Sequence, residues 1–537
     1  MKALNTIRSG AFVLVAASLT LTACGAKEET PAQTSTSSPS TAATVTAQPN
    51  KYTQKLTLDW FISAPANTNL PDAAKDFVRK AIEEKFNVEL KVAYMATGTD
   101  YTTKTNTLLA SSPPDMWRDA TADGGQKYAL DGILADMTKF VTPQTMPNYF
   151  KYWTTADELK NYQVQGKFVR APLPYSKSVY RSFYIRKDWL DKLGLKLPTN
   201  YTEYYNILKA FTTGDPDGNG KGDTYGFTTA GSGLNLGTEW PELLKNGIFS
   251  PAPIKNNTYQ DLTASPEMQG ALDDVLKVIN DKLVDPDWYL NKPPQHIEKA
   301  IQGKVGVVMG TTKDFAFDNN QQGIQFRSKQ VNPNANWVPF TMFPNQPITS
   351  EPAPGAPFLF AKTVADKNPE RIERSVAILD WLASEEGYIL THFGEANKHY
   401  TRNGNAITLN LDAYSNDIGK NGDFLKVWSF FTGVVAQPEV YGLTVVDSRE
   451  TDRDREITKF LDAIPKNKFV GTSLVAPEGF DLAGYRKRQN ELFSKVIFED
   501  KSAKNWPLYR DELMTKYKGK DLYDKYIADL KAAGILK

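Results

Sequence analysis

The sequence predicts an α/β protein divided into two or more lobes, and three observations support this. At 537 residues the chain is too long for one ordinary hydrophobic core. Alternating apolar segments, typical of strands, are interspersed with amphipathic helical segments over most of the chain. Hydrophobic residues make up 41% of the chain and charged residues 23%, as in ordinary globular proteins.

The first ordered segment is predicted to be a βαβ unit. Leu56, Leu58 and Trp60 alternate with polar residues, as in a half-buried strand. An apolar stripe at helical spacing predicts a helix over 74–86, and a second alternating run predicts a strand over 88–92. A strand, a helix and a strand in this order indicate a parallel sheet with a right-handed crossover.

The elements that follow alternate in the same way. Asn200 and Glu203 have the spacing of a capping box, and Pro369 suits the first turn of a helix. The same reasoning predicts helices over 103–110, 188–193, 201–212 and 369–383, a strand or loop over 115–117, and strands over 180–185 and 304–309.

The first 23 residues are predicted to be a lipoprotein signal peptide. Lys2 and Arg8 precede an apolar run over 11–21, which is too short to span a membrane as a helix. The run ends in Leu-Thr-Ala-Cys-Gly, which resembles a bacterial lipobox and contains the only cysteine of the chain, Cys24. The resemblance implies that Cys24 carries a lipid that anchors the protein outside the cytoplasmic membrane.

Residues 24–52 are expected to form a disordered tether. Thr, Ser, Ala, Pro and Gln dominate this segment, and large apolar residues are nearly absent. Such a segment cannot bury enough apolar surface to offset the entropy lost on ordering. It therefore acts as a spacer and not as a domain.

Composition and motifs argue against several functions. The formal net charge of +1 argues against nucleic acid as the main partner. Three scattered histidines, His296, His392 and His399, give no sign of a zinc site or a nucleophilic triad. The Gly-rich stretch 214–222 lacks the Lys-Ser/Thr ending of a phosphate-binding loop, so ATP hydrolysis is expected on another subunit.

Four stretches together resemble the extracellular solute-binding proteins of family 1, the lipoprotein receptors of carbohydrate ABC importers. They are Tyr-Ile-Arg-Lys-Asp-Trp-Leu-Asp-Lys-Leu-Gly-Leu at 184–195, Asp215 to Gly226, Gly-Lys-Val-Gly at 303–306, and the segment from Asn368 to Tyr400. The resemblance implies a monomer with a two-lobe periplasmic-binding-protein-like fold of type 2, in which crossover hinge strands join the lobes. It places residues 53–175 and about 312–356 in an N-lobe, and 176–311 and about 357–537 in a C-lobe.

A glycine-rich acidic loop is the sharpest local motif and is predicted to bind structural calcium. Oxygen side chains at loop positions 1, 3, 5 and 9, and a backbone carbonyl at position 7, match an EF-hand-like loop. These positions are Asp215, Asp217, Asn219, Asp223 and Lys221. Position 12 is Gly226 instead of a bidentate glutamate, so a turn without an ion remains the alternative.

Aromatic residues, which make up 12% of the chain, suggest a carbohydrate site. A sugar ring presents a flat C–H face to an aromatic ring, and its hydroxyls need fixed polar partners. The candidate ligand-binding residues are Trp60, Asp115, Trp117, Arg186, Trp240, Trp337 and Arg402. The two arginines offer planar forks for an acidic sugar's carboxylate. The alternative is that the tryptophans pack in the core and the arginines form salt bridges.

The function expected from these observations is that of a receptor without enzymatic activity. It would capture an oligosaccharide between two lobes and deliver it to the permease subunits of an ABC transporter. Two alternatives stay open at this point. One is a surface enzyme that degrades polysaccharide with a pair of carboxylates, and the other is a receptor for a non-sugar solute such as a peptide.

Overall fold

The fold is taken from a computed structural model. It describes residues 52–64, 68–96, 98–120, 124–156, 158–159, 163–164, 167–170, 180–237, 239–248, 254–259, 261, 265–343, 349–350, 357–432, 437–467, 474–532, 534 and 536–537. The predicted signal peptide, Cys24 and nearly all of the predicted tether lie outside these residues.

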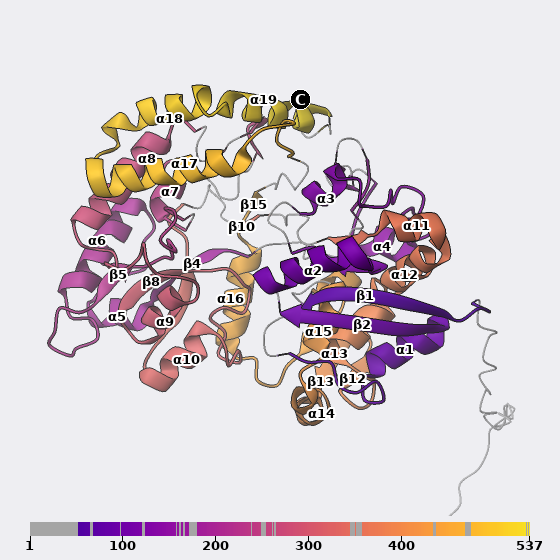
Figure 1. The fold of residues 1–537 in the computed structure, drawn as a ribbon. Helices are drawn as coiled ribbons and strands as arrows, with labels where there is room; N and C mark the ends of the chain where they lie inside the picture. The colour runs from indigo at the N-terminus through magenta and orange to yellow at the C-terminus, as the bar shows by residue number, and fades with distance from the viewer. Residues whose placement is uncertain are drawn as a thin grey trace, which may run out of the picture. The chain divides into compact units, whose positions relative to one another are not determined.

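The first lobe contains a four-stranded sheet with the strand order β11-β3-β1-β2. Figure 1 labels two of these strands, β1 and β2, which lie side by side. The strands are β1 (Leu56–Ala64), β2 (Val88–Ala96), β3 (Met116–Arg118) and β11 (Phe358–Phe360). β1 pairs in parallel with β2 and with β3, whereas β11 runs antiparallel to β3. The predicted parallel βαβ unit is therefore confirmed.

Two helices pack together against this sheet, α1 (Phe77–Phe86) and α12 (Pro369–Leu382). The Asp76 carboxylate accepts a hydrogen bond from the Arg79 N–H at 3.0 Å, so it caps α1. The cap explains why α1 begins later than residue 74, where the apolar stripe begins. Every residue of β1 from Trp60 onward is buried, as expected for an inner strand of a sheet covered by helices.

The first lobe also contains several shorter elements. They are α2 (Thr99–Ser111), α3 (Gln126–Leu130), α4 (Pro147–Tyr152), α11 (Lys362–Lys367), α13 (Glu385–Phe393), β12 (Tyr400–Asn403), β13 (Ala406–Leu409), α14 (Leu411–Asp417), η2 (Gly419–Asn421), α15 (Leu425–Trp428), η3 (Ser429–Phe431), η4 (Pro438–Tyr441) and β14 (Thr444–Val446).

The second lobe contains another four-stranded sheet, with the order β5-β8-β4-β9. Its strands are β4 (Ser182–Arg186), β5 (Tyr225–Phe227), β8 (Val305–Gly310) and β9 (Trp337–Phe340). β5 is parallel to β8, and β4 runs antiparallel to both β8 and β9. The two sheets, with helices in both lobes, confirm the predicted two-lobe α/β fold.

Helix α6 (Tyr201–Thr213) begins as the sequence predicts. The Asn200 Oδ1 atom accepts a hydrogen bond from the Glu203 N–H at 3.0 Å. The Glu203 carboxylate, however, accepts from the Thr199 N–H at 2.8 Å instead of from the Asn200 N–H. The Asn200 and Glu203 side chains therefore each accept a bond from a backbone N–H. The donor to Glu203 is the Thr199 N–H, which lies one residue before the Asn200 N–H expected in a capping box.

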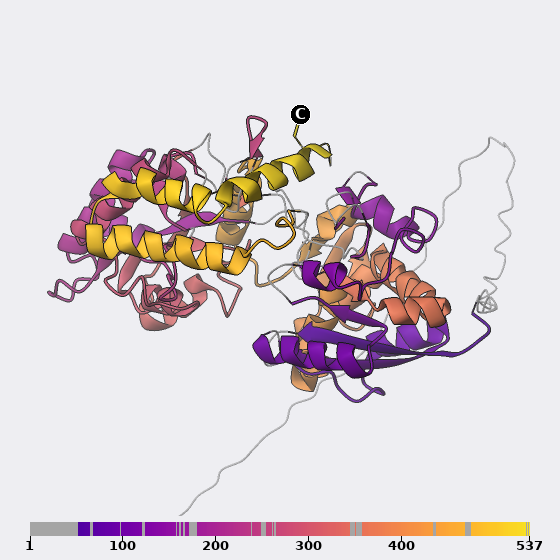
Figure 2. The same cartoon turned by 45° about the horizontal axis from the view of Figure 1, so that its top comes forward.

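The other elements of the second lobe are mostly helical. They are α5 (Lys187–Lys192), α7 (Pro241–Lys245), β6 (Ile254–Lys255), β7 (Thr258–Tyr259), α8 (Met268–Asn280), α9 (Gln295–Ile301), α10 (Ile324–Val331), α16 (Asp452–Asp462), α17 (Leu482–Ser494), η5 (Lys495–Asp500), η6 (Ala503–Asn505), α18 (Trp506–Thr515) and α19 (Gly519–Ala532). The C-terminal helices α17, α18 and α19 lie together, in yellow in Figure 2. No helix in the described part of the chain combines the length and apolarity needed to cross a membrane.

Two chain segments belong to different lobes from those expected. The segment from β8 to β9 stays in the second lobe, where Ala316, Ile324 and Trp337 are core residues. The segment from β11 to β14 packs into the core of the first lobe. The expected boundaries assigned 312–356 to the first lobe and everything from 357 to the second. The difference arises because β9 pairs with β4, so the chain returns to the first sheet only at β11.

A short parallel pair forms between the segment that leads from β9 to β11 and the segment that leads from α16 to α17. β10 (Thr349–Ser350) follows β9 and precedes β11, and it pairs in parallel with β15 (Lys466–Asn467).

Candidate ligand-binding site

The topology of the first lobe indicates that a ligand would bind at the edge of its sheet where the parallel strands end. In open α/β sheets, ligands bind beyond the carboxyl ends of the parallel strands. At this edge β1 ends at Ala64 and β3 ends at Arg118. β11 enters at the same edge, because Phe358 pairs with Arg118 and the Asp119 N–H donates to the Pro357 carbonyl at 2.8 Å. The chain therefore arrives from the second lobe where the parallel strands end.

Arg118 is the most prominent polar side chain at this edge. Its Nη1 atom donates to the Ser63 Oγ atom at 2.7 Å, and its guanidinium lies 4.3 Å from the ring centroid of Phe430. Its Nε atom is buried and has no hydrogen-bond partner among the described residues. Burial lowers the pKa of Arg118 to about 10, against the opposing effect of Tyr101 and Asp119.

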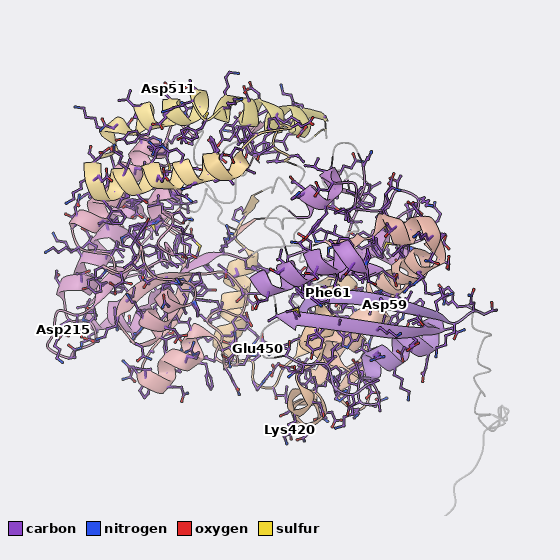
Figure 3. The ribbon with its side chains drawn as sticks, in the orientation of Figure 1. Asp59, Phe61, Asp215, Lys420, Glu450 and Asp511 are labelled. Carbon is purple, nitrogen blue, oxygen red and sulfur yellow. The ribbon has the colours of Figure 1, made fainter. Side chains whose placement is uncertain are left out.

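Tyr101, from α2, ties the ends of β1 and β3 together. Its hydroxyl lies 3.0 Å from the Phe61 carbonyl oxygen and 2.7 Å from the Arg118 carbonyl oxygen. Its ring stacks on Phe61 with a centroid distance of 4.7 Å. Phe61 is labelled on β1 in Figure 3, two residues from Asp59. This arrangement fixes the backbone that carries Arg118.

The second lobe has a comparable edge, where β5 ends and Thr228 and Thr229 follow. The Thr229 hydroxyl donates to Glu239 Oε2 at 2.7 Å. His296 is 5% exposed, and its Nε2 atom lies 3.8 Å from the same carboxylate. Burial lowers the pKa of His296, which favours the neutral imidazole, and burial also lowers the pKa of Arg181, although Glu239 opposes both effects.

A buried polar network holds this second edge in place. Asp285 Oδ2 accepts from the Thr228 hydroxyl at 2.9 Å and from the Asn291 amide at 2.8 Å, and Lys299 pairs with Asp285 Oδ1 at 2.9 Å. Burial alone would raise the pKa of Asp285, but the hydrogen bonds from Lys299 and Asn291 outweigh it and lower the pKa. Asp285 therefore stays ionised and orders the loop that carries Thr229.

Both edges can bind hydroxyl-rich molecules. The first lobe offers guanidinium N–H donors beside an aromatic ring, and the second offers a carboxylate acceptor with hydroxyl and imidazole neighbours. Sugar hydroxyls both donate and accept, so donors and acceptors on two rigid scaffolds suit a saccharide.

The structure places the four candidate tryptophans in the hydrophobic cores. Trp60, Trp117, Trp240 and Trp337 are each no more than 1% exposed. The indole N–H groups of Trp60, Trp240 and Trp337 donate to Ser375, the Leu236 carbonyl and Ser328. All ten tryptophans of the chain are buried, so the tryptophan content reflects core packing. This placement differs from the expected role as sugar platforms, because no ring face is open to solvent.

The other three candidates form ion pairs. Arg186 is 1% exposed and holds Asp188 in a bidentate pair. Arg402 pairs with Glu385 at 2.5 Å on the exposed surface. Asp115 is buried and accepts from the Asp59 N–H at 2.8 Å and from Arg371 at 2.7 Å.

Burial raises the pKa of Asp115 to about 6, although the Asp59 N–H and Arg371 both oppose this shift. The structure therefore gives Asp115, Arg186 and Arg402 ion-pair partners within the protein.

No sequence pattern singled out Arg118, Ser63, Phe430 or Glu239 as site residues. Arg118 directly follows Trp117, and alternation along a strand places neighbouring side chains on opposite faces. That alternation is a signal for Arg118 at the strand end. Phe430 lies far away in the sequence, so nothing local indicates that it meets Arg118.

The predicted calcium loop follows α6, where Figure 3 labels Asp215. The Asp215 carboxylate accepts from the backbone N–H groups of Gly218, Asn219 and Gly220 at 3.0–3.1 Å. These bonds outweigh the opposing effect of desolvation and lower the pKa of Asp215. Asp217 behaves differently, because burial and the nearby charges of Asp223 and Asp215 raise its pKa. Negative charge therefore converges inside the loop.

Side chains within and beside the loop satisfy these carboxylates. The Asn219 amide nitrogen donates to Asp217 at 2.7 Å and to Asp223 at 3.1 Å. Lys304 pairs with Asp223 at 2.6 Å. Within the described residues, no group of three or more His, Cys, Asp or Glu side chains is arranged to hold a metal ion.

Comparison with known proteins supplies independent information. A family model described as bacterial extracellular solute-binding protein matches residues 67–389. The chain is 25% identical over 349 residues to the polygalacturonan/rhamnogalacturonan-binding protein YtcQ of Bacillus subtilis, covering 61% of this chain and 64% of that protein. It is 25% identical over 341 residues to lipoprotein LipO of the same organism, covering 60% and 63%. The match thus spans less than two thirds of the length of these relatives.

A third relative is the fructooligosaccharide ABC transporter substrate-binding protein FusA of Streptococcus pneumoniae. The chain is 26% identical to it over 237 residues, covering 42% of each chain.

Solved structures show the same fold. A solute-binding protein of Bifidobacterium longum infantis, described as HMO-binding and associated with an ABC transporter, has a TM-score of 0.65 at 18% identity and covers 88% of this chain and 99% of its own. FusA in complex with kestose has a TM-score of 0.60 at 17% identity, covering 89% and 99%. The alginate-binding protein AlgQ2 without calcium ion has a TM-score of 0.62 at 16% identity, covering 89% and 98%.

Proposed function

Because the chain belongs to the bacterial extracellular solute-binding protein family, we propose that it captures an oligosaccharide and delivers it to an ABC transporter permease. The observation that carries this proposal is the pair of polar edges, each at the carboxyl ends of parallel strands in its own lobe. A ligand that touches both edges favours the closed arrangement of the lobes, because only that arrangement makes all contacts.

The relatives support a sugar as the ligand. YtcQ is named for binding polygalacturonan and rhamnogalacturonan, and FusA for fructooligosaccharide. Both names describe binding proteins. For this chain, the guanidinium beside Phe430 and the Glu239 carboxylate supply the donor and acceptor chemistry that such ligands need. Delivery requires no chemical change of the sugar.

The proposed location is the outer surface of the cytoplasmic membrane, with Cys24 carrying the lipid anchor. The relative LipO is named as a lipoprotein, which supports this assignment. The protein acts as a monomer in this proposal, tethered by the segment 24–52 near its permease.

Calorimetry with the folded protein tests the proposed function. Titration with tetragalacturonate, nystose and maltotetraose should give binding to at least one of them, with the recovered sugar unchanged by mass spectrometry. Small-angle scattering should show a smaller radius of gyration with the bound sugar, because the lobes close. Absence of binding to every sugar offered, or a cleaved sugar, would contradict the proposal.

The loop 215–223 is proposed to bind structural calcium. One similar structure is described as an alginate-binding protein without calcium ion, and another as an EF-hand mutant of FusA. In this chain Asp215, Asp217, Asn219 and Asp223 would supply side-chain oxygens and Lys221 its carbonyl. A divalent cation would relieve the repulsion that contributes to the raised pKa of Asp217. It has to compete with the Asn219 amide nitrogen and with Lys304 for the carboxylates.

Calcium should raise the melting temperature of chelator-treated protein, and Asp217→Asn should abolish most of that rise. At a calcium concentration of about 100 times Kd, binding stabilises the native state by about 2.7 kcal/mol. Asp452→Asn is a matched control, because Asp452 has a 95% exposed side chain far along the chain from the loop. An equal calcium response in wild type and Asp217→Asn would contradict the site.

A further inference from the structure

Arg118 presents an unused hydrogen-bonding edge at the proposed sugar site. We propose that the Nε and Nη2 atoms of Arg118 bind the carboxylate of an acidic sugar residue, so that the preferred ligand is an acidic oligosaccharide. This inference rests on the proposed function and narrows it from oligosaccharides in general to those that contain a uronic acid.

Arg118 differs from the two arginines that the sequence predicts as ligand-binding residues. Arg186 pairs with Asp188, and Arg402 pairs with Glu385. Arg371, on the same lobe as Arg118, pairs with both Asp115 and Asp59. Arg118 forms no such ion pair within the part of the chain that the structure describes. A cation at the carboxyl end of a strand therefore lacks its counter-ion.

The neighbours of Arg118 fix its guanidinium plane. Phe430 stacks beneath it at 4.3 Å, and Ser63 accepts from Nη1 at 2.7 Å. These two contacts leave the opposite edge, formed by Nε and Nη2, directed away from Ser63. Nε is buried without a partner among the described residues, so it is a donor that has lost water without gaining an acceptor.

The charge around Arg118 favours an anion over a neutral hydroxyl. Burial is the main cause of its lowered pKa, so the loss of hydration outweighs the compensating charges of Tyr101 and Asp119. Asp119 and Tyr101 are the titratable groups that act on it, and neither forms an ion pair with the guanidinium within the described residues. A hydroxyl would satisfy Nε but would leave the charge unpaired. A carboxylate would accept two parallel N–H···O bonds and would also pair the charge of the guanidinium.

Paired ligands that differ only in charge test this inference. Tetragalacturonate and its fully methyl-esterified form have the same backbone, and nystose and maltotetraose represent neutral sugars. Wild-type protein should bind tetragalacturonate at least about 10-fold more tightly than the ester, as expected for a charge-assisted bidentate contact. Arg118→Lys should weaken tetragalacturonate binding by about 10-fold or more, because an ammonium cannot form the two parallel bonds.

Arg79→Lys serves as the matched control, since Arg79 lies on α1 of the same lobe and pairs with Glu83 one turn away. It should leave the affinities for both forms unchanged, and thermal melts should show that both variants are folded. Equal binding of acid and ester, or unchanged binding by Arg118→Lys, would overturn the inference. Binding of nystose or maltotetraose without tetragalacturonate would overturn it while the proposed function stands. Binding of none of these sugars would overturn both.

Discussion

Replacing Asp188 with asparagine is expected to lower the free energy of unfolding of the second lobe by about 3–5 kcal/mol. The Asp188 carboxylate accepts two hydrogen bonds from Arg186, whose side chain is 2% exposed. The guanidinium also lies 4.7 Å from the ring of Trp189, so it is enclosed on its remaining side. Without the carboxylate, a buried cation loses its counter-ion and cannot recover hydration.

Urea denaturation followed by tryptophan fluorescence measures this effect, because Trp189 and Trp337 both lie near the guanidinium. Asp191→Asn is the matched control on the same helix. Asp191 has a 59% exposed side chain and pairs with Lys187 one turn away, so its loss should cost less than about 1 kcal/mol. Equal destabilisation by the two substitutions would show that the burial of the Arg186–Asp188 pair has no energetic consequence.

Local patterns in the sequence predicted the fold well. The alternation at Leu56, Leu58 and Trp60 and the helical stripe after it correspond to β1 and α1, and Asn200 caps α6 as expected. Such features depend on residues close in sequence. The lobe to which a segment belongs does not depend on residues close in sequence. It depends on whether β9 pairs with β4 and β11 with β3. Those pairings join segments far apart in the chain, and no local pattern specifies them.

The candidate site was harder to predict for a related reason. Tryptophan suits both a sugar platform and a protein core, and sequence alone does not distinguish the two environments. In this protein every tryptophan is buried. Arg186 was singled out for its planar fork, but Asp188, two residues away, occupies that fork. Arg118 carried a weaker signal, since its available edge depends on contacts with Ser63 and with the distant Phe430.

Replacing Trp60 with alanine is expected to destabilise the first lobe by about 3–5 kcal/mol, the range observed when large core side chains are truncated. Trp60 is 1% exposed, and its ring lies 5.4 Å from that of Phe431. Its indole N–H donates to the Ser375 hydroxyl at 3.1 Å, which links β1 to α12. Chemical denaturation gives the loss, and Leu130→Ala is the control, because Leu130 is 49% exposed in the same lobe.

Trp60→Phe separates the core role from a sugar-binding role, because it keeps an aromatic ring but removes the N–H donor. If Trp60 is a core residue, this variant should lose stability and retain the affinity for saccharide within about 3-fold, which corresponds to a change in binding free energy of no more than about 0.7 kcal/mol. Ser375→Ala should cost about 1–3 kcal/mol, because it leaves the indole N–H of Trp60 buried without an acceptor. In the double variant Trp60→Phe/Ser375→Ala that unsatisfied donor is gone, so the two losses should not add. Strict additivity would contradict the hydrogen bond, and a large loss of sugar affinity in Trp60→Phe would contradict the burial of the ring.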